Sequence, residues 1–491
     1  MELNCGEVLA KLLKKEGVKY IFGVPGGQLF PFIQAISQEE GMEVITTRHE
    51  ENAAHMADAV SRLTGTIGVC FGTTGPGATN MLPGVAAAYA DSIPLLAITP
   101  NNQTFCTYPF IGGLQDGNHK QLYSAVTKWN AVIHDWNRIP ELFQTAVRMA
   151  YNGRPGPVHL DIPADIMFKK GEVGDLPEPQ SYRFSGKVRA DQNLIERTYE
   201  MLVAAERPLL LAGGGVVRSG ALEELRAFMR ETAIPVTTTP MGAGCTSPQD
   251  ENFFGGGGWL GGEAVVKALQ EADLVIAVGC RFSTWVGYGR QPMMGGPQQK
   301  IIHVDIDAER VGQNASISIG IVADAKVFLQ DLSALHRREK RALKMDSNWP
   351  ASLKKAYQAF QKKASEIADT PSTPMNQATL AKEIATVIDE DAVVCFDGGQ
   401  AMEWSSTFVK IHQPQQKLFN PGMGHLGFGQ PFANAAKLCY PGRQVVNLAG
   451  DGSFGCTLQE LETAVRYNLP VINVISNDKA WGMIKGGQCA L

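Results

Sequence analysis

One local pattern recurs along this chain: a short apolar run rich in β-branched residues ends in glycine, and an amphipathic, helix-like stretch follows. Examples are "YIFGVPGG" (20–27), "DLVIAVGCRF" (273–282) and "QVVNLAGDG" (444–452). Strands that alternate with helices at this spacing build parallel sheets with helices on both faces. The sequence therefore predicts an α/β fold.

The length of the chain sets the number of domains. A chain of 491 residues is long enough for three domains of ordinary size. We expect three doubly wound parallel-sheet domains in series, at residues 1–170, 190–335 and 372–491. The polar segment 171–189 carries two prolines and predicts a linker. The charged run at 337–366 predicts a solvated surface helix between domains.

Composition excludes several classes of partner. The net charge is -5, so there is no basic surface for nucleic acid or anionic lipid. No apolar run reaches the roughly 18 residues of a membrane span. The nine cysteines include no CxxC pair, which indicates buried thiols in a reducing compartment. We expect a cytoplasmic protein that binds small molecules or copies of itself.

The stretch "NLAGDGSFGCTL" (447–458) predicts an anion and metal site. Gly450 and Gly452 let the backbone approach a phosphate, and Ser453 is predicted to cap the helix that begins near 456. Asp451 adds the carboxylate oxygen that Mg²⁺ prefers. One helix and one strand later, Asp478 returns to the same sheet edge and completes the coordination. The alternative interpretation is a solvated turn with a capping aspartate.

Taken together, the GDG turn, the helix, the buried strand and the turn "NDKAWG" (477–482) resemble the magnesium and diphosphate motif of thiamine diphosphate-dependent enzymes. The N-terminal third is similar to the acetolactate synthase branch of that family. It carries "GVPGG" (23–27), "TTRHEENAAHMADAVSRLTG" (46–65) and "TTGPGATN" (73–80) in the family's order. The resemblance covers essentially the whole chain.

The resemblance assigns catalytic roles to two residues. Glu50 corresponds to the family glutamate that hydrogen bonds the aminopyrimidine ring and promotes loss of the thiazolium proton. Glu51 is adjacent, but the register of the HE motif selects Glu50. On local sequence alone, Glu50 is an acidic residue that favours the helix dipole. Gln115 stands where the family carries a glutamine near the thiazolium ring.

Further cofactor contacts follow from the same resemblance. Leu426 corresponds to the bulky apolar residue that holds the cofactor in its bent form, although a leucine there also reads as plain core. Mg²⁺ is expected on the side chains of Asp451 and Asp478 and the carbonyl oxygen of Ala480. The remaining expected cofactor contacts are Gly26, Gly27, Pro76, Asn80, Gln400, His425, Gly450, Gly452 and Ser453.

The implied activity is decarboxylation of a pyruvate-like 2-oxo acid followed by carboligation to a second carbonyl compound, catalysed by a lyase or transferase. The cofactors are thiamine diphosphate and Mg²⁺. In the family, the pyrimidine domain of one chain faces the diphosphate domain of another. We therefore expect a homodimer or homotetramer with active sites at the subunit interface.

Several positions depart from the family pattern. Ala164 replaces a lysine, Trp285 an arginine and Gly487 a tryptophan, and Asp478 stands where asparagine is usual. These changes leave two alternatives open. One is another lyase or acyltransferase, of the 2-oxo acid decarboxylase, oxalyl-thioester or sulfoacetaldehyde type, and the other is a non-catalytic cofactor-binding homologue.

The resemblance leaves two further points open. "LLLAGGGV" (209–216) and "TTTPMGAG" (237–244) resemble the flavin-binding segments of the central domain, so FAD is a further candidate cofactor. Tight turns explain the same glycines equally well. The chain ends at Leu491, before the family's closing segment, which predicts a C-terminal truncation or an unusually open pocket.

Overall fold

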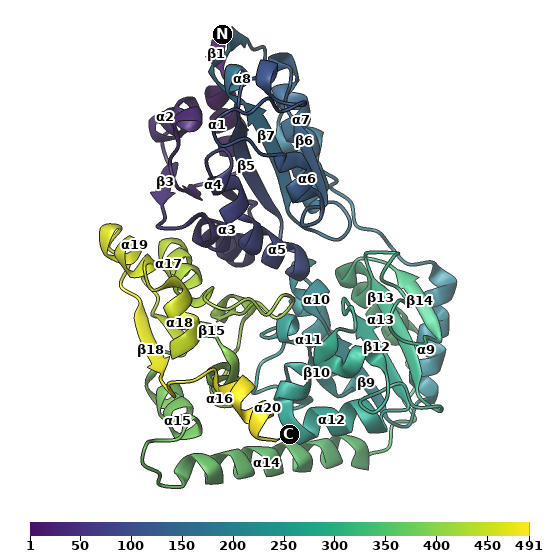
Figure 1. Ribbon diagram of the computed structural model, residues 1–491. Coiled ribbons are helices and arrows are strands. Elements are labelled where there is room, and N and C mark those ends of the chain that lie inside the picture. The colour runs from purple at the N-terminus through teal and green to yellow at the C-terminus, as the bar shows by residue number, and fades with distance from the viewer. Residues whose placement is uncertain (491) are drawn as a thin grey trace. The chain divides into compact units, whose positions relative to one another are not determined.

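The computed structural model describes residues 1–490, which form two compact units (Figure 1). The first unit contains residues 1–185, 393–398 and 420–475. The second contains residues 186–392, 399–419 and the chain from 476 onward. Three sheets of six, six and four strands confirm the predicted α/β class.

The N-terminal sheet has the order β3-β2-β4-β5-β7-β6, and every paired neighbour is parallel. Its strands are β2 (Tyr20–Gly23), β3 (Glu43–Thr46), β4 (Gly68–Phe71), β5 (Leu95–Asn101), β6 (Trp129–Val132) and β7 (Val158–Pro163). Its helices are α1 (Cys5–Lys15), α2 (Phe30–Gln38), α3 (Glu50–Thr64), α4 (Pro76–Asn80), α5 (Leu82–Asp91), α6 (His119–Ser124), α7 (Ile139–Tyr151) and α8 (Ala164–Phe168).

The central sheet has the order β11-β10-β9-β12-β13-β14 and is also parallel. Its strands are β9 (Pro208–Ala212), β10 (Val236–Thr238), β11 (Phe253–Gly256), β12 (Leu274–Val278), β13 (Lys300–Asp305) and β14 (Ile319–Val322). Its helices are α9 (Gln192–Ala204), α10 (Gly214–Arg218), α11 (Leu222–Thr232), α12 (Gly262–Glu271) and α13 (Ala325–Glu339).

The C-terminal sheet has the order β16-β15-β17-β18, with β15 and β17 parallel. Its strands are β15 (Val393–Asp397), β16 (Lys417–Leu418), β17 (Val445–Gly450) and β18 (Ile472–Ser476). The helices of this part of the chain are α15 (Gln377–Val387), α16 (Gly399–Phe408), α17 (Gly429–Cys439), α18 (Asp451–Thr457), α19 (Glu460–Arg466) and α20 (Gly482–Cys489).

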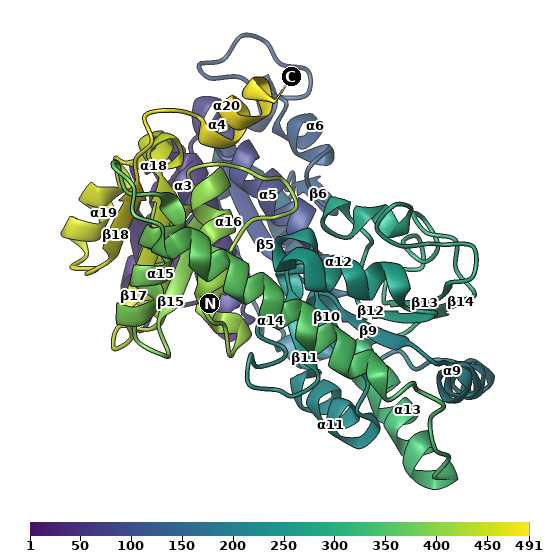
Figure 2. The same cartoon turned by 90° about the horizontal axis from the view of Figure 1, so that it is seen from below.

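The segments 171–189 and 337–366 were predicted as a linker and as one surface helix. Both contain more secondary structure than that. Within 171–189, β8 (Lys170–Glu172) pairs antiparallel with β1 (Glu2–Asn4). The charged run divides because α13 ends at Glu339, and the following residue, Lys340, has a left-handed backbone. The long helix α14 (Asn348–Asp369), prominent in Figure 2, then packs against α12.

Helix α3 is the most deeply buried helix of the first unit. It packs against β4, α5 and α17, and nearly all of its residues are buried. At its C-terminal end, Arg62 binds Asp58 and Asp91 from within the protein. Paired charges of this kind are required where a guanidinium leaves water. The helix is therefore fixed along its whole length, including the acidic residues at its start.

No helix in residues 1–490 is long and apolar enough to cross a lipid bilayer. All nine cysteines are free thiols. Six are buried and Cys439 is partly buried, whereas Cys456 and Cys489 are exposed.

Candidate functional site

The first group of predicted residues lies where β2 and β4 end. A Cβ atom added at Gly26 would lie 2.2 Å from Thr73 Oγ1, and one at Gly72 would lie 2.6 Å from the carbonyl oxygen of Gly77. Only glycine allows backbones to approach so closely. The "GVPGG" loop, which includes Gly26 and Gly27, thus reaches the "TTGPG" turn at the carboxyl edge of the sheet, where ligands bind in folds of this class.

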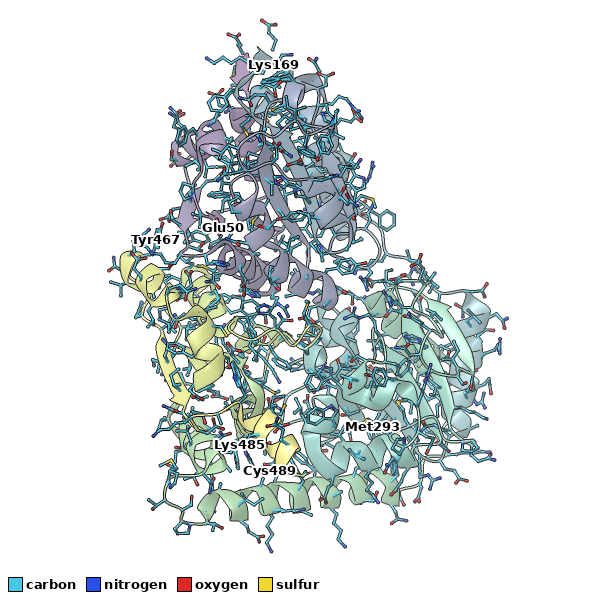
Figure 3. The ribbon with its side chains drawn as sticks, viewed as in Figure 1. Glu50, Lys169, Met293, Tyr467, Lys485 and Cys489 are labelled. Carbon is cyan, nitrogen blue, oxygen red and sulfur yellow. The ribbon has the colours of Figure 1, made fainter. Side chains whose placement is uncertain are left out.

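Glu50 is the first residue of α3 and is only 8% exposed (Figure 3). Asn80 Nδ2 donates a 3.0 Å hydrogen bond to Glu50 Oε2. A Cβ atom added at Gly77 would lie 3.1 Å from Glu50 Oε1. Pro76 begins the short helix α4 that carries Asn80. The structure therefore brings Glu50, Pro76 and Asn80 together, and their roles toward a cofactor remain a prediction.

Gln115 belongs to the loop 103–118 and lies beside the same turn. Its φ is +63°, and a Cβ atom added at Gly75 would lie 2.5 Å from its carbonyl oxygen. The loop is held by Asp116, which accepts hydrogen bonds from the backbone of Gly112 and Gly113. Gln115 is thus near Pro76.

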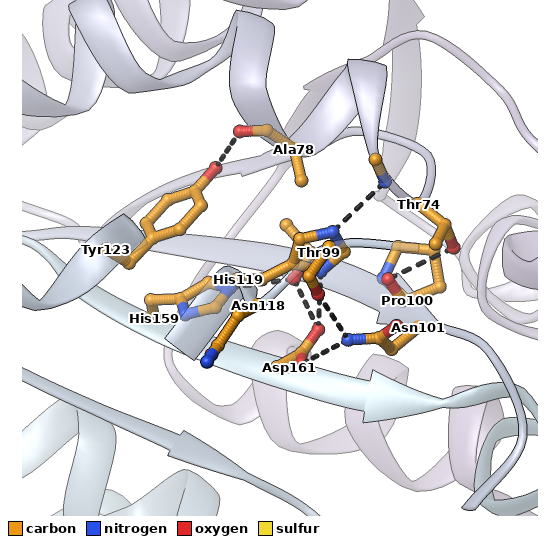
Figure 4. A network of polar contacts seen from close by, with 12 residues as sticks. Thr74, Ala78, Thr99, Pro100, Asn101, Asn118, His119, Tyr123, His159 and Asp161 are labelled. Atoms are coloured by element: carbon orange, nitrogen blue, oxygen red, sulfur yellow. Dashed lines mark hydrogen bonds and ion pairs between the residues drawn. The ribbon is translucent and has the colours of Figure 1, made fainter. Parts of the chain in front are cut away.

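A buried polar network around Asp161 holds the turn at Gly75 in place (Figure 4). Gly75 donates its N–H to His119 Nε2 at 3.0 Å, and His119 Nδ1 lies 2.9 Å from Asp161 Oδ1. Because Nε2 accepts, Nδ1 carries the proton of the neutral ring. Thr99 and Asn101 donate to Asp161 at 2.8 Å each. The network fixes the position of Gly75, next to Pro76.

Asp161 accepts these hydrogen bonds best as a carboxylate, and its surroundings favour that ionised form. Burial alone would raise the pKa of Asp161, but His119 and the other donors lower it overall. Burial lowers the pKa of the neighbouring His159 to about 3. Sequence reasoning missed this network. The available signal was "VHLDIP" (158–163), which places a histidine and an aspartate within an otherwise apolar strand.

Leu426 lies in the loop before α17, and Asp397 fixes that loop. Asp397 Oδ1 accepts from Gly427 N at 3.2 Å, and its Oδ2 accepts from Gly429 N at 2.8 Å. Thr457 Oγ1 donates to the Gly427 carbonyl at 2.6 Å. Burial raises the pKa of Asp397 to about 6. Asp397 was not predicted, although it precedes the "GGQ" (398–400) that led to Gln400.

A second buried carboxylate, Glu460, joins segments distant in sequence. It accepts hydrogen bonds from Arg48 N and Asn52 Nδ2 at 2.9 Å each and from Thr463 Oγ1 at 2.6 Å. The segment that enters α3 is further attached where Thr46 N donates to Tyr467 Oη at 2.8 Å. Glu460 was also missed, because "LQELETAVRYN" reads as an ordinary amphipathic helix.

The strand end at Gly450 leads directly into α18. The helix begins at Asp451, and Gly450 is its N-cap residue. The prediction that Ser453 caps a helix beginning near 456 is wrong, because no turn separates strand from helix and no side chain caps α18. Ser453 is instead buried in the first turn, where a Cβ atom added at Gly398 would lie 2.3 Å from its Oγ. The carboxyl ends of β15 and β17 meet there.

In the second unit, Gln400 and Asp478 converge on Gly482. A Cβ atom added at Gly482 would lie 2.1 Å from Asp478 Oδ2 and 2.8 Å from Gln400 Oε1. Asp478 Oδ1 accepts from Ala480 N at 3.0 Å, which forms a tight turn and orients Ala480. Asp451 belongs to the first unit, and Asp478 and Ala480 belong to the second. The three-residue magnesium set remains a prediction.

The glycines of the predicted flavin segments pack against backbone. A Cβ atom added at Gly213 would lie 2.0 Å from the Gly279 carbonyl oxygen, and one at Gly215 would lie 2.6 Å from Gly279 Cα. Close packing alone therefore accounts for these glycines. Trp285, which stands where the family has arginine, stacks on Trp259 with ring centroids 5.1 Å apart. FAD binding remains a prediction.

Known proteins resemble this chain along its whole length. Three family models match it: the thiamine pyrophosphate enzyme N-terminal TPP binding domain at 3–120, the central domain at 195–332 and the C-terminal TPP binding domain at 397–490. A probable acetolactate synthase large subunit from Methanocaldococcus jannaschii is 37% identical, covering 97% of this chain and 80% of the relative. One from Methanococcus aeolicus is 34% identical, covering 98% and 82%. The acetolactate synthase large subunit of Corynebacterium glutamicum is 33% identical, covering 98% and 76%.

The buried carboxyl of Asp397 predicts a specific dependence of stability on pH. Its pKa is about 6 in the folded chain against 3.8 for the free side chain, so the folded state binds the proton more tightly. Its contribution to the free energy of unfolding is therefore largest below pH 3.8 and is lost as the pH rises through about 6. The whole change is on the order of 3 kcal/mol.

An Asp397→Asn variant cannot ionise at this position. We expect its stability, relative to the wild-type chain, to rise between about pH 4 and pH 7 in urea unfolding experiments. The exposed Asp175→Asn serves as the matched control and should shift little. Equal pH dependence of the two variants would contradict the role of Asp397.

Proposed function

The chain belongs to the thiamine pyrophosphate enzyme family, and from that premise we propose that it decarboxylates a 2-oxo acid such as pyruvate and joins the product to a second carbonyl compound. The observation that carries the proposal is the placement of Glu50. This carboxyl group is almost fully removed from water, hydrogen bonded to Asn80, and adjacent to Gly77. A residue needed only for binding has little use for such a shielded acid.

The donor set of the proposed site suits the cofactor and its metal. At the diphosphate end, the side-chain oxygen of Ser453 lies beside Gly398, where a strand ends, and Asp451 starts the adjoining helix. Backbone N–H groups at such an edge suit a diphosphate. Asp451, Asp478 and the carbonyl of Ala480 would supply the oxygen ligands that Mg²⁺ prefers. Gln400 would contact the diphosphate from beside Asp478.

When bound, thiamine diphosphate supplies a carbon nucleophile and an electron sink for the loss of carbon dioxide. Glu50 Oε1 would share a proton with a pyrimidine nitrogen, a role that requires shielding from water. Asn80 orients Glu50 through its hydrogen bond to Oε2. Asp161 and His119 hold the turn that carries Pro76.

The other side chains would shape the pocket. Leu426 would press the cofactor into its bent form, and its loop is anchored by Asp397 through Gly427 and Gly429. Gln115 would lie near the reacting carbon, since it packs against Gly75. The reaction involves no net electron transfer, so the proposal does not require FAD. The free cysteines fit a cytoplasmic setting.

A second candidate function is supported by the stacked tryptophans. Trp285 stacks on Trp259 and also contacts Phe419, so an aromatic cluster stands where the family carries an arginine. A substrate that relies less on that cation, such as an oxalyl thioester or sulfoacetaldehyde, suits this change. The choice between the two candidates concerns the substrate and leaves the roles of Glu50 and the cofactor unchanged.

The deciding experiment is a substrate panel with the full chain, thiamine diphosphate and Mg²⁺, read out as carbon dioxide release and product analysis. We expect turnover of a 2-oxo acid, and we expect Glu50→Gln to reduce the rate at least about 100-fold because the proton relay is lost. The exposed Glu43→Gln is the control and should retain activity.

Each other outcome of the panel has one interpretation. Turnover of the thioester or the sulfonated aldehyde alone would select the second candidate. Cofactor binding without turnover of any substrate would contradict both and leave a non-catalytic homologue.

The metal assignment generates a separate prediction. Asp478→Ala removes one proposed ligand, so binding of thiamine diphosphate in the presence of Mg²⁺ should weaken by about 10- to 100-fold. Titration calorimetry of the cofactor at fixed Mg²⁺ measures this directly. Glu251→Ala removes an exposed carboxylate of the same unit and should bind like the wild-type chain. Unchanged binding by Asp478→Ala would remove Asp478 from the metal site.

We further propose that the active form is at least a homodimer, in which Glu50 of one copy faces Asp451 of another. The loop that carries Gln115 supports this, because it exposes three large apolar side chains: Phe105 (78%), Ile111 (66%) and Leu114 (84%). Apolar groups gathered on one loop are characteristic of an interaction surface.

Complementation tests this assembly. Glu50→Gln and Asp451→Ala should each be inactive alone. Coexpressed, they should recover about a quarter of the wild-type activity, since mixed dimers contain one intact site. As the control, cells that express Glu50→Gln from both plasmids should show no activity. Failure of the mixed pair to recover any activity would place both residues in a site within one chain.

A further inference from the structure

Three side chains of the first unit meet near the start of α3, apart from the residues assigned to Mg²⁺. Glu51 is the second residue of α3, His55 follows one turn later, and His425 comes from the loop before α17. Glu51 Oε1 lies 3.3 Å from His425 Nε2 and 3.7 Å from His55 Nε2. The three ligand atoms all lie within 4.8 Å of one another.

The hydrogen bonding of these histidines is incomplete. His55 is fully buried, yet neither of its ring nitrogens has a hydrogen-bond partner. Nδ1 of His425 is also buried without a partner. A buried polar atom left in this way costs free energy, and such atoms are rare in folded proteins.

The spacing suits a metal ion better than a set of hydrogen bonds. Zinc–ligand bonds of about 2.0–2.1 Å in a tetrahedron place neighbouring ligand atoms about 3.4 Å apart. The two measured separations from Glu51, 3.3 and 3.7 Å, lie close to this value. Hydrogen bonds between an imidazolium and a carboxylate are shorter, about 2.7–2.9 Å.

The chemistry and the exposure of the cluster also suit a metal ion. Each imidazole offers a ring nitrogen and the carboxylate offers an oxygen as a ligand atom, which is the donor set that divalent transition metals bind. Glu51 and His425 each remain about one-fifth exposed, which leaves an entry path for an ion and a water ligand.

We propose that Glu51, His55 and His425 bind a divalent transition-metal ion, with Zn²⁺ as the best match to two imidazoles and one carboxylate. The fourth position is left for water. The ion joins the start of α3, where Glu50 lies, to the loop that carries Leu426. Within one chain it therefore links helix α3 to the loop before α17, independent of which substrate the enzyme uses.

Metal binding by the full-length protein tests the site. The chain is first stripped with a chelator, then titrated with Zn²⁺ by calorimetry in excess Mg²⁺, which fills the oxygen-ligand site at Asp451. Co²⁺ provides a second readout, because tetrahedral Co²⁺ absorbs visible light strongly. We expect one ion per chain, a tetrahedral Co²⁺ spectrum, and a higher unfolding temperature when Zn²⁺ is present.

Two variants and one control decide the outcome. Glu51→Gln keeps the shape of the side chain, and His425→Ala changes a loop residue. Each should weaken Zn²⁺ binding more than about 100-fold and abolish the Zn²⁺-dependent rise in unfolding temperature. His134→Ala removes an exposed histidine of the same unit and should bind normally. The proposal would be overturned if the wild-type chain bound no Zn²⁺, or if Glu51→Gln and His425→Ala both bound Zn²⁺ as tightly as the wild-type chain.

Discussion

Helix α3 has almost no access to water, and this constraint organises the first unit. It packs between its own sheet and α17, so a polar side chain on it that lacks a partner costs free energy. Arg62 pairs with two aspartates, Asn52 Nδ2 with Glu460, and Glu50 with Asn80, whereas the ring nitrogens of His55 have no hydrogen-bond partner. These pairs also fix the direction of the helix, and so they fix where its acidic start points. Glu50, the acid proposed to act in catalysis, is therefore held in place by the fold.

Much of the fold could be predicted because its signals are local. Each parallel strand is a short apolar run that ends in glycine, and each helix has an apolar stripe, so the α/β class and the three sheets follow from neighbouring residues. The error at Ser453 shows where local reasoning stops. Glycine at a strand end permits either a turn or an immediate helix, and only the packing of β15 against β17 decides that α18 starts at Asp451.

The candidate site divides in a similar way. Glu50, Pro76, Asn80 and Gln115 could be placed from motifs, and the structure brings them together around one turn. Asp397, Glu460 and Asp161 were missed, because most of their partners are backbone and side-chain groups far away in the sequence. A buried carboxylate that accepts such bonds looks, in sequence, like any polar residue at a strand end or on a helix. Its role is visible only once distant segments are adjacent.

The distribution of thiols has a practical consequence. Two of the nine cysteines are exposed, Cys456 on α18 and Cys489 on α20, so each compact unit presents one accessible sulfur. Maleimide spin labels would attach to these positions without any engineered mutation. Electron spin resonance of the doubly labelled wild-type chain could then follow movement of one unit against the other when the vitamin-derived coenzyme is added.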